Sequence, residues 1–246
     1  MRVLVLGHKG MLGNAVLKFL KHKKITTLTT DIRWPTDNFK NFVEQCKCDF
    51  VVNCIGAIPQ RKDNFAVNHE LPCWLDSMAN IKIIHPGTDC EIDNDSYGLS
   101  KRRAVDYIIS SGKNTKIIKT SIIGHEINSR ASLLDWFLNE KESVRGYNNH
   151  FWNGNTTLQW SKICLDLMQN WDSYEILTIV ATEPVSKYNL LITIAEVYNK
   201  NIVIEDFSHE QRVDNKTLSG NLPVPNIRKQ LIELKKFYNK GQQRGE

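Results

Sequence analysis

Hydrophobic residues in the first half of the chain alternate between two patterns. Residues 3–6 and 50–52 are short continuous apolar runs, which are typical of strands buried on both faces. Between such runs, as in 11–20, the apolar positions recur at the spacing of an amphipathic helix. Strands are expected at 3–6, 25–30, 50–57, 81–85 and 115–124, and helices at 11–23, 39–46, 71–78 and 99–110. Strands that alternate with helices in this way predict an α/β fold with a doubly wound parallel sheet.

The second half of the chain has fewer regular elements. Helical spacing is found at 132–140, 157–171 and 227–238, and a strand pattern at 175–181. This arrangement predicts a small C-terminal lobe that is interwoven with the last strand of the sheet. We expect the sheet domain to comprise residues 1–128 and 156–182, and the lobe to comprise residues 129–155 and 183–246.

The composition is that of an ordinary soluble globular protein. Of its 246 residues, 41% are hydrophobic and 24% are charged, and the net charge of +5 is spread along the chain. A nucleic-acid binder concentrates its basic residues in one stripe, so no nucleic-acid partner is expected. The first residues do not have the pattern of a signal peptide, so none is expected, and no apolar run approaches the roughly 20 residues of a membrane span. We therefore expect a cytoplasmic protein with no membrane partner.

Cysteine and histidine positions do not indicate a metal site. There are six cysteines, and the C-x-C pair of Cys46 and Cys48 has no second pair at the spacing of a zinc site. His85, His125 and His150 also lack metal-ligand spacing. The expectation is reduced, structural thiols and no bound metal.

Three glycines lie directly between the first predicted strand and the first predicted helix. In the segment LGHKGMLG, Gly7, Gly10 and Gly13 recur at three-residue intervals. Glycines let the backbone approach a pyrophosphate, which the N–H groups and dipole at the helix N-terminus stabilise. A glycine-rich turn without a ligand is the alternative, but the position at the first strand–helix junction favours a dinucleotide site of the Rossmann type.

The choice between NAD and NADP stays open. Asp31, at the end of the second predicted strand, is placed to accept hydrogen bonds from an adenosine ribose, which favours NAD. Arg33, two residues on, could instead bind a 2′-phosphate with the help of Lys9 in the glycine turn, which favours NADP. The alternative is that both basic side chains are simply solvated.

A candidate catalytic group lies in the segment TDCEIDNDSYGLSK. Tyr97 and Lys101 are four residues apart, so they share one face if the helix has begun. A nearby ammonium would lower the pKa of the tyrosine and could also hold the nicotinamide ribose. Thr88, after the strand 81–85, could donate to a substrate carbonyl as negative charge develops there. The alternative is a polar loop followed by a surface helix.

Together these motifs carry a resemblance to a known family. The glycine turn, FVVNCIGA at 50–57, Asn68 in AVNHELP, TDC at 88–90 and YGLSK at 97–101 resemble the extended short-chain dehydrogenase/reductase family, in particular its dTDP-4-dehydrorhamnose reductase-like branch. The resemblance implies a Rossmann-type NAD(P)-binding domain, a sugar-nucleotide lobe, and reduction of a 4-keto sugar by NADH or NADPH. The family's catalytic Thr, Tyr and Lys correspond to Thr88, Tyr97 and Lys101.

The resemblance also implies residues that hold the ligands. Those expected at the cofactor are Gly7, Lys9, Gly10, Met11, Leu12, Gly13, Asp31, Ile32, Arg33, Cys54, Ile55, Gly56, Tyr97 and Lys101, and those at the substrate are Thr88, Asp89, Trp152 and Asn153. Turn chemistry explains the asparagine-rich context of Trp152 and Asn153 about equally well. The sequence departs from the family at Gly87, which replaces a serine, and in a missing or very short third strand.

The function expected is reduction of a nucleotide-activated 4-keto-6-deoxy sugar in polysaccharide biosynthesis, by a protein that could be a homodimer. An epimerase uses the same Tyr–Lys chemistry but retains its NAD. A dehydratase needs an acid and a base, for which Asp89 and Glu91 are candidates, although Cys90 stands where a glutamate is expected. A non-catalytic dinucleotide-binding module is the alternative from another class.

Overall fold

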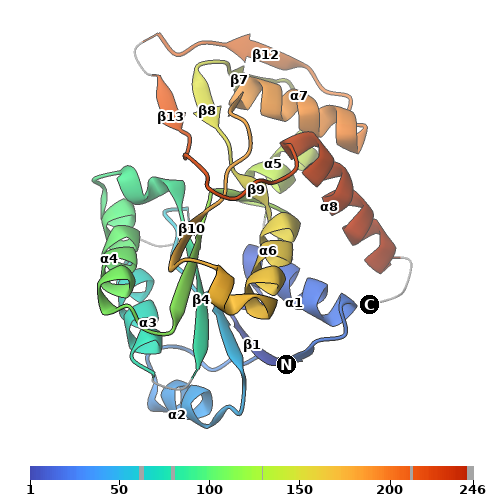
Figure 1. Ribbon diagram of the computed structural model, residues 1–246. Coiled ribbons are helices and arrows are strands. Elements are labelled where there is room, and N and C mark those ends of the chain that lie inside the picture. The colour runs from blue at the N-terminus through green and yellow to red at the C-terminus, as the bar shows by residue number, and fades with distance from the viewer. Residues whose placement is uncertain (61–63, 79–80, 129, 211–212, 243–246) are drawn as a thin grey trace.

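A parallel sheet forms the centre of the molecule (Figure 1). The computed structural model describes residues 1–60, 64–78, 81–128, 130–210 and 213–242. The strands of this sheet are β1 (Arg2–Leu6), β2 (Thr26–Leu28), β3 (Phe50–Asn53), β4 (Lys82–Gly87), β5 (Thr115–Lys119) and β10 (Leu177–Ile179). They are all parallel, in the order β10-β5-β4-β3-β1-β2. The predicted doubly wound α/β fold is confirmed.

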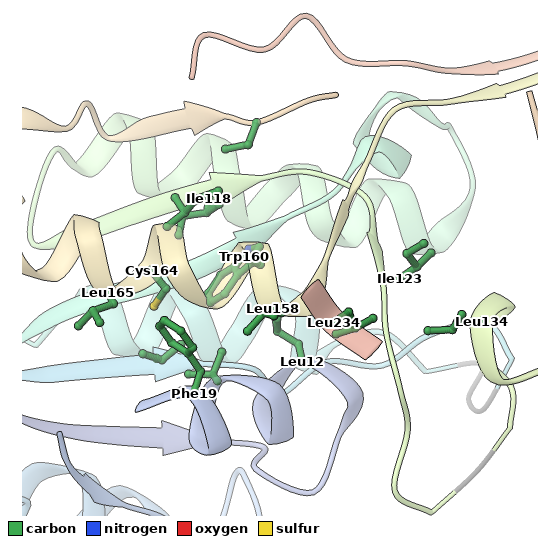
Figure 2. Packing of buried hydrophobic residues seen from close by; sticks show 14 of the residues in the cluster. Leu12, Phe19, Ile118, Ile123, Leu134, Leu158, Trp160, Cys164, Leu165 and Leu234 are labelled. Carbon is green, nitrogen blue, oxygen red and sulfur yellow. The ribbon is translucent and has the colours of Figure 1, made fainter. Parts of the chain in front are cut away.

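Helices cover both faces of the sheet, which explains its continuous apolar strands. The helices are α1 (Met11–His22), α2 (Asp37–Gln45), α3 (Val67–Asp76), α4 (Ser96–Ser111) and α6 (Thr157–Gln169). Val3 and Val5 of β1 pack into the core that contains α1 and α6, whereas Leu4 and Leu6 pack into the core that contains α2 and α3. Figure 2 shows Phe19 of α1 lying against α6 in the first of these cores.

The strand order reverses direction at β1, whose neighbours are β2 on one side and β3 on the other. The chain passes from β2 through α2 directly to β3, so no further strand lies outside β2 among the described residues. This confirms the expected loss of the third strand. Open α/β sheets bind ligands beyond the carboxyl ends of the strands where the order reverses. The predicted glycine turn follows β1 at this place.

Two predicted strands are wrong in their extent. The run 50–57 was expected to be one strand, but β3 ends at Asn53. The run 115–124 was expected to be continuous, but β5 ends at Lys119 and the separate strand β6 (Ile122–Ile123) pairs with β9 (Asn155–Thr156). The Asn155 side chain donates to Thr120 Oγ1 (2.9 Å) and to the Val180 carbonyl (3.0 Å). These buried hydrogen bonds draw the chain out of the main sheet between the two strands.

The remaining elements form a smaller assembly above the carboxyl ends of the sheet (Figure 1). It contains α5 (Leu133–Asn139), β7 (Val144–Tyr147), β8 (His150–Trp152), β11 (Val185–Ser186), α7 (Lys187–Tyr198), β12 (Ile204–Phe207), β13 (Asp214–Lys216) and α8 (Ile227–Gln242). Phe137, Leu190 and Leu234 belong to the same buried cluster as the sheet residues. The core therefore runs without a break from the sheet into this assembly. Among the described residues, no helix has the length and apolar character needed to cross a membrane.

Candidate functional site

The glycine turn packs tightly against the loop that follows β3. Gly7 has a φ of +73°, and a Cβ there would lie 2.7 Å from the carbonyl oxygen of Cys54. A Cβ on Gly13 would lie 2.2 Å from the carbonyl oxygen of Gly7. Both positions therefore require glycine for the fold itself. The turn brings Gly7 and Gly13 together with the predicted cofactor loop Cys54, Ile55 and Gly56.

The fold does not require a glycine at position 10 in the way that it does at positions 7 and 13. Its φ of −83° suits any residue, and the nearest atom to an added Cβ is the Gly7 carbonyl oxygen at 3.3 Å. Helix α1 begins at Met11, and no side chain of the described residues caps its N-terminus. The side chain of Leu12 is buried in the core, so it could meet a ligand only through its backbone. An uncapped helix N-terminus next to a glycine that the fold does not require is suited to binding a pyrophosphate.

Asp31 is connected to the glycine turn by an ion pair. Lys9 Nζ lies 2.7 Å from Asp31 Oδ1, and His8 Nε2 lies 3.7 Å from the same oxygen. The hydrogen bond from Lys9 lowers the pKa of Asp31. Strand β2 ends at Leu28, so Asp31 lies in the loop beyond it, where Ile32 and Arg33 are also exposed. This loop therefore presents both an acid and basic groups, and the choice between NAD and NADP stays open.

Arg33 provides a direct test of that choice. If its guanidinium binds a 2′-phosphate, Arg33→Ala should cost about 1.5–3 kcal/mol of NADPH binding and leave NADH nearly unchanged. Titration of both cofactors measures the difference, with Arg103→Ala, an exposed position on α4, as the control. Equal weakening of NADH and NADPH would show that Arg33 does not recognise the phosphate.

The predicted catalytic residues converge at the carboxyl end of β4. Thr88 follows β4 and caps the short 3₁₀-helix Asp89–Ile92. Helix α4 begins at Ser96, so Tyr97 and Lys101 lie one turn apart on one face as expected. A Cβ on Gly98 would lie 2.4 Å from the Cys90 carbonyl oxygen, so this glycine lets α4 approach the 3₁₀-helix closely.

Lys101 connects this group to the cofactor loop. Its Nζ lies 3.4 Å from the position that a Cβ would take on Gly56, and the side chain is 7% exposed. Asn68 fixes the same loop, because its amide bonds both the N–H and the carbonyl of Ala57, at 2.8 and 3.0 Å, and also Ser100 Oγ at 3.1 Å. The loop after β3 and the first turns of α4 are thus held in register.

Thr88 is held by the two acids that follow it. Its hydroxyl donates to Asp89 Oδ1 (2.9 Å) and accepts from the Cys90 N–H (3.3 Å). Its backbone N–H donates to Glu91 Oε1 (2.7 Å), and Glu91 Oε2 pairs with Lys119 Nζ (2.6 Å). The carboxylate of Glu91 is 3% exposed, so this is a buried ion pair. In this state the hydroxyl hydrogen of Thr88 is directed at Asp89, and donation to a substrate oxygen requires it to rotate.

Glu91 also explains why glycine occupies position 87. A Cβ on Gly87 would lie 2.9 Å from Glu91 Oε1 and 3.0 Å from Lys119 Cβ. A serine at this position would therefore displace the buried ion pair. Sequence reasoning missed Lys119, because its partner Glu91 is brought to it by the fold and not by spacing along the chain.

The pKa of Tyr97 differs from the expectation. Burial raises the pKa of this phenol, and the side chains of Cys90, Asp89 and Glu91 raise it further, against a smaller lowering by the hydrogen bond with Thr88. Burial lowers the pKa of Lys101, and Glu91 opposes that shift. The prediction that Tyr97 has a lowered pKa is wrong in this structure, because burial and the nearby acids dominate. A phenol that stays protonated at neutral pH is suited to donating a proton.

Glu91 raises the pKa of both Tyr97 and Lys101, which predicts a pH effect. If Tyr97 must be protonated to act, activity is lost as pH rises through its pKa. Removing the charge in Glu91→Gln lowers that pKa, so the alkaline limb of the pH–rate profile should move to lower pH. Glu44→Gln, at an exposed position, is the control.

Because Glu91→Gln leaves the Lys119 ammonium without its partner, the double variant Glu91→Gln, Lys119→Met should show the same shift with the balance of charge restored. An alkaline limb that stays in place in both variants would contradict the role of Glu91.

The side chains of Trp152 and Asn153 are engaged within the protein and are not free to contact a substrate. Trp152 is 7% exposed and belongs to the main hydrophobic core. The Asn153 amide donates to the Leu218 carbonyl (2.8 Å) and accepts from the Leu218 N–H (2.9 Å). Their predicted substrate contacts are therefore not supported, because packing and backbone hydrogen bonds already occupy both side chains.

The smaller assembly reaches the site through Lys216 instead. This lysine of β13 forms an ion pair with Asp93, which lies between the 3₁₀-helix and α4. Sequence reasoning missed Lys216, because nothing in its local sequence distinguishes it from other surface lysines. The pair places a positive charge from the lobe next to the loop that follows β4.

Comparison with known proteins supports this fold. No protein-family model matches the chain, and no curated protein matches it. Among solved structures, a dTDP-4-dehydrorhamnose reductase from Clostridium acetobutylicum matches with a TM-score of 0.80 at 17% identity, over 97% of this chain and 100% of that one. A second such reductase, from Bacillus anthracis in complex with NADP, matches at 0.72 and 14%, over 97% and 99% of the two chains.

A dTDP-glucose 4,6-dehydratase from Bacillus anthracis, in complex with NAD, matches with a TM-score of 0.72 at 12% identity, over 99% of this chain and 98% of that one. The chain thus has the same fold as these reductases and this dehydratase, and the resemblance seen in the sequence is confirmed at the level of the fold.

Proposed function

We propose that the chain is an NAD(P)H-dependent reductase of a nucleotide-activated 4-keto-6-deoxy sugar in polysaccharide or deoxysugar biosynthesis. The observation that carries this proposal is the convergence of Thr88, Tyr97 and Lys101 beside the loop that packs on the glycine turn. The solved neighbours include two keto-sugar reductases, one of them with NADP, which supports the same reaction class and cofactor.

The residues of this chain divide the work between cofactor and substrate. The glycine turn and the N-terminus of α1 would hold the pyrophosphate, and Lys101 would hold the nicotinamide ribose. When bound, the reduced nicotinamide supplies a hydride to the keto carbon. Tyr97 donates a proton from its phenol to the oxygen of that carbon, and the hydroxyl of Thr88 stabilises the charge on the same oxygen.

The engaged acids argue against a dehydratase. Such an enzyme needs one carboxyl group to protonate the leaving hydroxyl and a base to remove a proton from carbon. Glu91 is committed to Lys119 and to the Thr88 N–H, and Asp89 accepts from the Thr88 hydroxyl and the Cys90 N–H. Both are nearly inaccessible to solvent.

Incubation with a panel of nucleotide-linked 4-keto sugars and either NADH or NADPH tests the proposal. A reductase consumes cofactor in proportion to sugar, and NMR of the product should show the keto carbon converted to a carbinol. Tightly retained NAD after purification, with no net consumption of added cofactor, would instead indicate an epimerase. No change in any sugar would contradict the proposal.

A further inference from the structure

Cys46 and Cys48 form a thiol pair far from the proposed active site. They lie between α2 and the start of β3, at the amino end of the parallel sheet, whereas the glycine turn lies at the carboxyl end. Their Sγ atoms are 2.6 Å apart. Non-bonded carbon atoms pack about 3.5–4.0 Å apart, and a disulfide bond is about 2.05 Å long. The two sulfur atoms are therefore close enough to bond with little movement.

The backbone between the two cysteines is already closed. The Cys48 N–H donates to the Cys46 carbonyl over 2.8 Å, which folds the chain around Lys47 as a γ-turn. Both side chains are half-buried against the core cluster of α2 and α3. The sulfur atoms are thus held together on one side of the turn, and a bond between them would not require the neighbouring helix or strand to move.

The two thiols have different surroundings, and the difference indicates which of them is the nucleophile. The hydrogen bond between the two thiols and the charge of Arg2 lower the pKa of Cys46, and burial opposes them. The pKa of Cys48 is raised by its hydrogen bond with Cys46, by burial and by the Asp49 carboxylate. Asp49 is fixed beside the pair because it accepts from the Arg2 backbone N–H over 2.7 Å. Cys46 is therefore the better nucleophile, since the thiolate is the reactive form.

A cavity opens beside Cys46. It has a volume of about 320 Å³ and is lined by Arg2, Leu28, Phe42, Gln45, Cys46 and Lys47. Its polar lining carries two cationic side chains and no acid. The Arg2 and Lys47 side chains of the lining therefore favour a ligand with carboxylate groups, whereas the Asp49 carboxylate beside Cys48 lies outside this lining.

We propose that Cys46 and Cys48 are a redox-active dithiol that small disulfides bearing carboxylates oxidise to an intrachain disulfide. The Cys46 thiolate attacks one sulfur of the small disulfide, forms a mixed disulfide and releases one small thiolate. Cys48 then gives its proton to solvent and attacks the Cys46 sulfur, which forms the intrachain bond and releases the second small thiol. The protein loses two electrons and two protons, and the small disulfide gains them.

The other cysteines have no comparable partner arrangement among the described residues. Burial raises the pKa of Cys54 and of Cys164. Cys73 is partly exposed, and burial and Asp76 raise its pKa to about 11. Cys73 is therefore a matched internal control, since it is accessible but lacks an adjacent thiol and a positive neighbour.

The test is the reaction of the reduced full-length protein with oxidised glutathione, followed by acid quenching, alkylation and peptide mass spectrometry. The peptide that contains Cys46 and Cys48 should resist alkylation and lose two hydrogens, while Cys73 stays alkylated. Cys48→Ser should stop at a glutathione adduct on Cys46. Cys46→Ser should react at least about tenfold more slowly, because the thiolate fraction falls tenfold for each unit of pKa.

Cystamine, a cationic disulfide, tests the cavity. Oxidised glutathione should react faster than cystamine, and Arg2→Gln should reduce that preference. The proposal is overturned if Cys46 and Cys48 are alkylated as fully as Cys73 after exposure to oxidised glutathione. Equal or faster reaction with cystamine would overturn the assignment of the cavity to carboxylate-bearing disulfides. Neither result depends on the activity of the nucleotide-binding site.

Discussion

Tyr97→Phe is expected to lower turnover of an accepted keto sugar by about 10² to 10⁴ while cofactor binding survives. The change keeps the ring, which packs edge-on against Phe65 with ring centroids 5.6 Å apart, and removes only the hydroxyl. Burial and the nearby acids raise the pKa of the phenol, so it carries its proton at neutral pH. The variant therefore lacks this proton donor. Steady-state kinetics and cofactor titration measure the two effects separately.

A matched control is available on the same helix. Tyr107 of α4 is 39% exposed and lies away from the site, so Tyr107→Phe should change neither turnover nor binding. If Tyr97→Phe turned over at the unmutated rate, the catalytic role of Thr88, Tyr97 and Lys101 would be contradicted, and the segment would be only a polar loop and the start of a helix.

Gly10→Val is expected to weaken NADH and NADPH binding by at least about 100-fold, or about 2.8 kcal/mol. The backbone of Gly10 suits a valine, and the nearest protein atom to the new Cβ is 3.3 Å away. The Gly7 carbonyl need shift by only a few tenths of an ångström, and the new side chain would occupy the space in which the pyrophosphate is expected. Calorimetric titration of both cofactors measures the loss.

Gly13→Ala provides the contrast. Its Cβ would lie 2.2 Å from the Gly7 carbonyl oxygen, so this variant should lose thermal stability, whereas Gly10→Val should unfold near the temperature of the unmutated protein. If Gly10→Val bound the cofactors as tightly as the unmutated protein, the glycine turn would not be the pyrophosphate site.

The central sheet could be predicted because its signal is local. Strands buried on both faces produce continuous apolar runs, and each helix between them shows its own apolar stripe. In the lobe, helices α5 and α8 show such a stripe, but the elements between them lack these signals. Strand β13, with the sequence Asp-Asn-Lys, has no apolar residue and exists through its pairing with β8. Helix α7 is rich in β-branched and aromatic residues, which favour strands, and was not predicted from the sequence.

The candidate site could be predicted in part for the same reason. Tyr97, Lys101 and the three glycines are motifs with fixed local spacing, so their arrangement follows once the helices form. The buried pair of Glu91 and Lys119 joins the loop after β4 to the end of β5, and only the fold brings them together. Trp152 was misjudged because its polar neighbours indicate a loop, whereas its own side chain is buried.

Transfer of deuterium from the cofactor to the sugar is the decisive test of ketone reduction by this protein. The protein is incubated with an accepted nucleotide-linked 4-keto sugar and with NADPH or NADH that carries deuterium at the transferable position of the nicotinamide. We expect the label to appear on the former keto carbon, with one cofactor oxidised for each sugar reduced, and we expect Tyr97→Phe to slow this transfer. A product that contains no label, or sugar conversion without net oxidation of the cofactor, would contradict this expectation.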